Sequence, residues 1–160
     1  MKLAKLLSAD QILLDMKAED PWSAIIELVD HLVAIDRLPR NERDLLLAAL
    51  KTREDVVSTG IGCGMAIPHA FSDEIDEVVA VFGCSRVGLD FAALDHALVH
   101  FIILFIVPRQ HYYLHLRTLA AIAKMFTNRE IRRQLAAAQS RDEILAIFDS
   151  RPSRVAALGE

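Results

Sequence analysis

Hydrophobic residues recur at helical spacing in the first third of the chain. Asp20 precedes Pro21, an arrangement typical of a helix N-cap followed by proline at the first helical position. The apolar residues that follow would form one buried helix face: Trp22, Ile25, Ile26, Val29, Leu32 and Val33. A second helix is predicted from about residue 41 through 50, ending near residues 51–54. Its inward residues would be Leu45, Leu46, Ala49 and Leu50.

Two long apolar runs in the middle of the chain predict buried strands. Residues 78–84 and 99–107 are almost continuously apolar and rich in β-branched side chains. Such runs are typical of central strands that are covered on both faces. Pro108 is expected to end the second strand. Helices early, strands in the middle and helices late predict an α/β fold in which helices cover both faces of the sheet.

The last third of the chain predicts three further helices. The first runs from about residue 111 to 126, and its core side would carry Leu116, Leu119, Ala120, Ala123 and Phe126. The other two begin with capping boxes of the form Ser/Thr-x-x-Glu at 127–130 and 140–143. The final helix would bury Ile144, Leu145, Ile147 and Phe148. We expect residues 1–150 to form one domain and residues 151–160 to form a loose tail.

The segment 58–69 carries the strongest chemical signal in the chain. Its alternate glycines permit backbone angles that other residues avoid, so that N–H groups can turn toward one anion. Pro68 fixes the backbone next to His69 and so holds the imidazole on a defined path. We interpret the segment as a phosphate-binding loop beside a histidine that could carry a phosphoryl group. The residues predicted to form the loop are Ser58, Thr59, Gly60, Gly62 and Gly64.

Other residues could assist His69 or bind a metal. Arg53 could simply be a solvated arginine at a helix end. If the fold brings Arg53 near His69, its planar guanidinium would suit phosphate oxygens. His111 and His115 lie four apart on one helix face and could bind a metal. Tyr112 stands where a zinc protease motif would have its glutamate, which counts against a hydrolase. His115 also borders the apolar face, from which it could reach another segment.

The remaining polar candidates point to little further chemistry. His96 and His100 also lie four apart, but the strand interpretation leaves them unremarkable. Cys63 and Cys84 form no disulfide framework, and without paired Cys-x-x-Cys spacing they predict no structural zinc. We therefore expect no metal and no cofactor.

Length, hydrophobic content and net charge indicate what class of protein this chain belongs to. A chain of 160 residues with 53% hydrophobic and 25% charged residues is typical of one globular domain. The formal net charge of −4 argues against direct nucleic-acid binding. The apolar run at 101–107 is far too short to span a bilayer, and the first residues lack the apolar core of a secretion signal. We therefore expect a cytoplasmic protein.

These motifs together resemble the fructose/mannitol-type IIA domains of the bacterial phosphoenolpyruvate:sugar phosphotransferase system. The most specific match is Arg53-Glu54 followed by residues 58–69, and further matches follow in the family's order at 90–95, 99–108 and 115–120. The resemblance extends from about Leu6 to Phe148. It is strongest to the free-standing, nitrogen-regulatory branch, to which residues 132–140 are also similar.

The resemblance implies a mixed α/β fold and a phosphocarrier without small-molecule turnover of its own. His69 matches the family's histidine that is phosphorylated by an HPr-like carrier. His115 matches the histidine that orients the phosphoryl group, and Arg53 matches the arginine that neutralises the charge of the phosphoryl group. Implied regulatory partners are potassium transporters or sensor kinases. Two departures, Ala70 for the common glycine and Cys63 for the common asparagine, are expected to alter local geometry slightly.

Two alternatives to a regulatory phosphocarrier stay open within this resemblance. One is a sugar-specific IIA component that passes the phosphoryl group to a separate IIB protein. The other is a binding module that has kept the fold and lost phosphotransfer. The second alternative predicts a missing histidine or arginine, and His69, His115 and Arg53 are all present.

Overall fold

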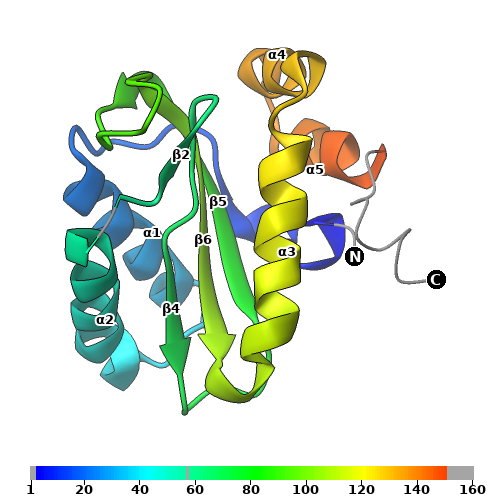
Figure 1. Cartoon of the computed structure of the whole chain (residues 1–160). Helices are drawn as coiled ribbons and strands as arrows, with labels where there is room; N and C mark the ends of the chain where they lie inside the picture. Colours follow the sequence, from blue (N-terminus) through cyan, green and yellow to red (C-terminus); the bar gives the residue numbers. More distant parts are fainter. Residues whose placement is uncertain (1–2, 57, 151–160) are drawn as a thin grey trace.

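The computed structural model describes residues 3–56 and 58–150 (Figure 1). Its strands are β1 (Ile12–Leu13), β2 (Gly60–Gly62), β3 (Met65–Ala66), β4 (His69–Ser72), β5 (Val79–Leu89) and β6 (Val99–Pro108). Its α-helices are α1 (Pro21–Ala34), α2 (Arg43–Val56), α3 (Tyr112–Met125), α4 (Arg129–Ala137) and α5 (Arg141–Ser150). Short 3₁₀ helices occupy Leu3–Lys5, Ala9–Gln11, Arg40–Glu42 and Arg109–His111.

The strands form one mixed sheet in which β6 is the central member. The sheet has the order β1-β5-β6-β3-β2, and β4 also pairs with β6, beyond β3. β5 runs antiparallel to β6, whereas β3 and β4 both run parallel to it. The predicted strands at 78–84 and 99–107 are confirmed, and β5 continues to Leu89 after an irregular register beyond Cys84.

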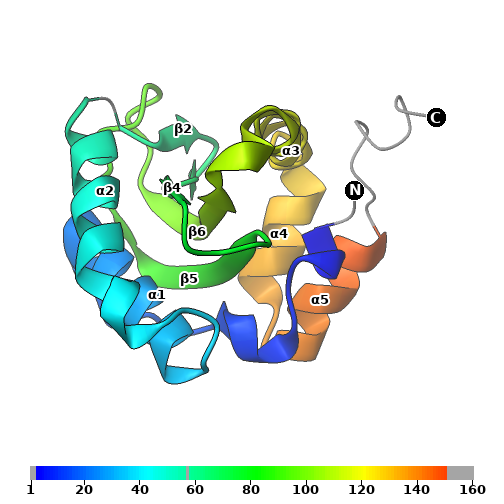
Figure 2. The same ribbon diagram turned by 90° about the horizontal axis from the view of Figure 1, so that it is seen from below.

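Helices cover both faces of the sheet, as the apolar runs predicted. Figure 2 shows α1 and α2 on one side of β5 and β6, and α3, α4 and α5 on the other. Alternate residues of β6 divide between the two layers. Phe101, Ile103, Phe105 and Val107 belong to the core beneath α3–α5, and Ile102, Leu104 and Ile106 belong to the core beneath α1 and α2.

Two predicted helix faces need correction. Leu45 is 65% exposed, because the buried face of α2 is centred on Leu46, Leu47 and Leu50, which turns Leu45 toward solvent. α2 also starts later than predicted and continues to Val56, so Arg53 lies within its last turn. Leu116 on α3 is 43% exposed and Ala120 is exposed as well, because the buried face of this helix carries His115 and Ile122 instead.

The N-terminal cap of α4 differs from the predicted capping box, whereas the predicted Ser140 bond at α5 is present. Asn128 caps α4, since its side-chain oxygen accepts hydrogen bonds from the N–H groups of Glu130 (2.9 Å) and Ile131 (3.3 Å). Thr127 instead donates its hydroxyl to the Lys124 carbonyl. At α5 the Ser140 hydroxyl accepts from the N–H of residue 143, as predicted. The prediction for residues 151–160 lies outside the described residues.

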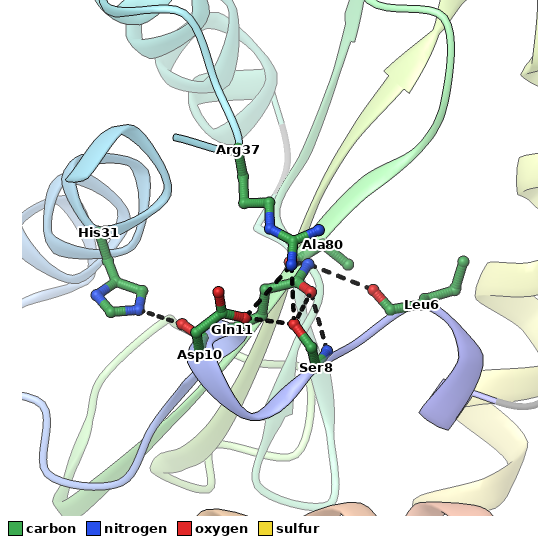
Figure 3. Close-up of polar contacts among 7 residues, drawn as sticks. All are labelled: Leu6, Ser8, Asp10, Gln11, His31, Arg37 and Ala80. Carbon is green, nitrogen blue, oxygen red and sulfur yellow. Dashed lines mark hydrogen bonds and ion pairs between the residues drawn. The ribbon is translucent and has the colours of Figure 1, made fainter. Parts of the chain in front are cut away.

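A polar network ties the N-terminal segment to the sheet and to α1 (Figure 3). The buried Gln11 amide donates to the Ala80 carbonyl on β5 at 2.7 Å and accepts from the N–H and hydroxyl of Ser8. The same segment is bonded to α1, because His31 donates from Nε2 to the Asp10 carbonyl at 2.6 Å. These bonds hold residues 8–11 against β5 and α1, although β1 is only two residues long.

Candidate functional site

The glycine-rich segment, predicted to be a loop, contains a β-hairpin. β2 pairs antiparallel with β3, and the turn between them places Gly62, Cys63 and Gly64 at φ values of +93°, +57° and +75°. Glycine is favoured at such angles because it lacks a Cβ. Gly60 is needed for packing instead, since a Cβ there would lie 3.0 Å from the Cβ of Phe91. Contact between these residues and a phosphoryl group stays a prediction.

The hydroxyls of Ser58 and Thr59 tie the base of this hairpin to residues of neighbouring segments. Ser58 donates to the Phe91 carbonyl and accepts from the N–H of Gly60. Thr59 donates both its hydroxyl (2.9 Å) and its N–H (3.0 Å) to the half-buried Glu54 carboxylate. Burial raises the pKa of Glu54, partly offset by these hydrogen bonds. Sequence reasoning gave Glu54 no separate role, although it lies next to Arg53.

His69 is held in place by the sheet. It begins β4, where it lies in register with Phe105, and the N–H of Phe105 donates to the Pro68 carbonyl at 3.0 Å. Partners in adjacent strands share a face of the sheet. His69 therefore faces the α3 layer, as Phe105 does. Pro68 and the register together fix the direction in which the imidazole leaves the backbone.

A single backbone hydrogen bond determines the tautomer of His69. Its Nδ1 lies 2.9 Å from the carbonyl oxygen of Ile67. A carbonyl can only accept a hydrogen bond, so Nδ1 carries the proton. In the neutral ring Nε2 then bears the lone pair, which makes Nε2 the nucleophilic atom.

His115 lies beside His69 on the first turns of α3. The two ring centroids are 5.7 Å apart, and His115 is only 3% exposed. Phe105 packs edge-on against His115, with centroids 5.2 Å apart, and Phe71 lies edge-on to both imidazoles. The structure therefore brings together two histidines that are 46 residues apart in the sequence.

The environment favours the neutral form of both imidazoles. Burial lowers the pKa of His69, and the positive charge of Arg53 lowers it further. The hydrogen bond to the Ile67 carbonyl raises the pKa and offsets part of this change. Burial, followed by the charge of His69, lowers the pKa of His115 to about 4. Arg53 acts on His69 from the last turn of α2, which packs against β4 on the other side of the sheet (Figure 1). The site therefore combines two neutral histidines with one nearby cation.

The aromatic neighbours of the histidines were missed by sequence reasoning. Phe71 and Phe105 contact one or both rings, and an expectation of a strand at residue 69 would have placed Phe71 on the same face two residues later. Tyr112 also packs against Phe71, with ring centroids 5.3 Å apart.

The other candidate ligands do not assemble into a metal site. His111 lies in the 3₁₀ turn before α3 and, with His115, lines a cavity of about 20 Å³, room for about one water. Within residues 3–56 and 58–150, no three His, Cys, Asp or Glu side chains form a group suited to a metal ion. Cys63 is exposed and Cys84 is buried, and both are free thiols. No helix in this part of the chain is long and apolar enough to cross a membrane.

Comparison with known proteins places the chain in one family. Residues 5–151 match the family described as phosphoenolpyruvate-dependent sugar phosphotransferase system, EIIA 2. The chain is 32% identical over 149 residues to the fructose-specific EIIABC component of Bacillus subtilis, covering 93% of the chain but only 23% of that larger protein. It is 36% identical over 105 residues to the nitrogen regulatory protein of Klebsiella oxytoca, covering 65% of each.

The fold agrees with these sequence matches. The crystal structure of nitrogen regulatory protein IIA-Ntr from Neisseria meningitidis superposes with a TM-score of 0.82 at 28% identity, covering 91% of this chain and 98% of that one. The fold and the family match define a IIA-type domain, a class whose members are phosphotransferase components. The chain belongs to the EIIA 2 family of the phosphoenolpyruvate-dependent sugar phosphotransferase system, which confirms the resemblance and the fold class.

The lowered pKa of His115 predicts a pH-dependent stability. Between its ordinary value of 6.5 and about 4, the unfolded chain binds more protons at this site than the native chain does. Stability contributed by the neutral imidazole is therefore present above pH 6.5 and lost as the pH falls toward 4, by up to about 3 kcal/mol. Urea unfolding of wild type and His115→Gln at pH 7, 6 and 5 measures this loss. Equal pH slopes for the two proteins would contradict the buried neutral histidine.

Proposed function

We propose that the chain is a phosphocarrier that accepts a phosphoryl group on Nε2 of His69 from a phosphorylated HPr-like protein. The observation that carries this proposal is the hydrogen bond from Nδ1 of His69 to the Ile67 carbonyl, which leaves Nε2 as the nucleophile. The lowered pKa of His69 keeps that nitrogen unprotonated near pH 7. The family match supports the same general class of phosphotransfer.

The proposed step needs no proton to leave the ring. Nε2 of His69 forms a bond to phosphorus while the bond between phosphorus and the donor's nitrogen breaks. Nδ1 keeps its proton, and the Ile67 carbonyl stabilises the positive charge that the phosphorylated ring acquires. Arg53 attracts the equatorial oxygens as charge shifts among them. His115, neutral and held by Phe105, orients the transferred group by donating an N–H.

We infer that phosphorylation then regulates the partners of this protein. A phosphohistidine adds about two negative charges at one place on the surface. Beside His115, α3 exposes an apolar surface made of Tyr112, Tyr113, Leu114 and Leu116. A new dianion next to this surface would weaken apolar contacts or attract basic ones. The similarity to nitrogen regulatory proteins supports regulatory targets, such as potassium transporters or sensor kinases.

The sugar-specific alternative keeps the same chemistry at His69. The similarity to the fructose-specific EIIABC component favours transfer onward to a IIB protein. In that case the phosphoryl group would pass from His69 to the IIB protein. The exposed apolar surface on α3 would then be the docking site for that IIB protein.

The phosphoryl acceptor can be identified by mutation. With phosphoenolpyruvate and the general phosphotransferase proteins, wild type should take up one acid-labile phosphoryl group, and His69→Gln should take up none. His115→Gln should slow uptake by about 100-fold, in line with loss of an oriented donor. His96→Asn is the matched control, since His96 is exposed and its φ of +59° suits asparagine. A wild type without uptake would leave only the non-catalytic binding module. A His69→Gln variant labelled normally would show that another residue accepts the phosphoryl group.

The charge switch predicts different partners for different states of His69. Pull-downs from the source organism should compare phosphorylated protein, unphosphorylated protein and His69→Asp. At least one partner should be retained by only one state, with the His69→Asp result intermediate because it adds one charge. His96→Asp adds the same charge at an exposed position between β5 and β6, outside β4 and α3, and should leave the partner set unchanged. Identical sets in all states would refute the switch, and rapid transfer of label to a IIB protein would favour the sugar-specific role.

A further inference from the structure

A second cavity lies away from the histidine pair. It has a volume of about 530 Å³ and is lined by the β2–β3 turn, β5, the start of β6 and α4. Figure 1 shows α4 and this turn at the same end of the molecule. Along β6 the cavity lies at Phe101, four residues or about 13 Å from the Phe105 that pairs with His69. Its volume is typical of a site for a small molecule.

The wall of this cavity is mainly apolar. Phe101 of β6 and Cys84 of β5 are cross-strand partners, and both line it. The other apolar lining comes from Leu14, Leu135, Ala136 and Ala138. An apolar wall of this kind can hold a hydrocarbon or aromatic group but gives it little orientation.

Four arginines provide the charged part of the lining, and Ser85 and His100 add polar groups. Arg129, Arg132 and Arg133 lie on one face of α4, and Arg86 comes from β5. Arg86 is paired with Asp15, their Nε and Oδ1 lying 2.6 Å apart. Because this pair is neutral overall, the net charge of the cavity is set by α4.

Two of the α4 arginines keep an uncompensated charge. Arg133 pairs with Glu130, whereas Arg132 donates to the neutral Phe126 carbonyl at 2.5 Å. Among residues 3–56 and 58–150, no carboxylate forms an ion pair with Arg129 or Arg132. The cavity therefore carries two positive charges in a chain whose formal net charge is −4.

Helix stability does not account for these arginines. Arg129 is the first residue of α4 and Arg132 lies in its next turn, where the helix macrodipole disfavours cations. Both side chains line the cavity, so the cations are placed where an anion could bind them. A guanidinium offers several N–H donors suited to carboxylate or phosphate oxygens.

We propose that this cavity binds a small organic anion with an apolar body. Arg129 and Arg132 hold its carboxylate or phosphate head, and the body packs against Phe101 and Leu135. Gly64 of the predicted phosphate loop lines the cavity but His69 does not, so the ligand acts as an effector and takes no part in the chemical step at His69. Failure of this proposal would leave the phosphocarrier function untouched.

Octanoate, with octanol as its neutral counterpart, tests the proposal. We expect octanoate to shift the ¹H–¹⁵N NMR signals of Gly64, Phe101 and Ala136 saturably and to bind at least tenfold more tightly than octanol, because charge-assisted hydrogen bonds add to burial of the same hydrocarbon. Octyl phosphate should shift the same signals, since the proposed head group includes phosphate. Equal affinity for octanoate and octanol, or shifts confined to other parts of the chain, would overturn the proposal.

Variants separate the two components of binding. Arg129→Gln with Arg132→Gln should remove the preference for octanoate, whereas Arg141→Gln, at the exposed first residue of α5, should leave it intact. Ala136→Trp, an exposed helix position at the cavity, should block octanoate and octanol alike. Unchanged octanoate binding in either cavity variant would contradict the site. Binding of an acidic peptide without octanoate would assign this face to a protein partner instead.

Discussion

The arrangement of this molecule depends on the pairing of β6 with strands on both of its edges. β5 occupies one edge in antiparallel register, and β3 and then β4 occupy the other in parallel register. Both faces of β6 are buried, so its alternate side chains specify which residues meet each helix layer. A slip of one residue would exchange the faces and separate His69 from His115. The geometry of the candidate site therefore follows from the register of a buried strand.

Within this sheet, the backbone of Ile67 and Pro68 determines the orientation and the tautomer of the His69 ring. Pro68 lies between β3 and β4, and its carbonyl is bonded to β6. The preceding residue, Ile67, presents the carbonyl that binds Nδ1 of the imidazole. Phe71 and Phe105 exclude water around the neighbouring His115 and so keep it neutral. The site uses backbone and aromatic groups to orient two neutral rings, and Arg53 supplies the charge.

Much of the architecture could be predicted from local patterns. The apolar runs at 78–84 and 99–107 indicated central strands, and the flanking periodicity indicated helices on both faces. The meeting of His69 and His115 was expected only from the family resemblance, because no local rule relates a strand residue to a helix residue 46 positions later. The hairpin at 60–66 was missed, since three glycines lower strand propensity, while parallel pairing with β6 is a tertiary effect. Leu45 and Leu116 were misplaced because an apolar side chain on a helix does not by itself identify the buried face.

We propose that the Ile67 carbonyl makes Nε2 of His69 the phosphoryl acceptor. The direct measurement is ¹⁵N–³¹P NMR of the phosphorylated protein with ¹⁵N-labelled histidine rings. We expect a phosphorus coupling to Nε2 of His69 and a proton retained on Nδ1. Phosphorus coupled to Nδ1 of His69, or to a nitrogen of His115, would contradict it.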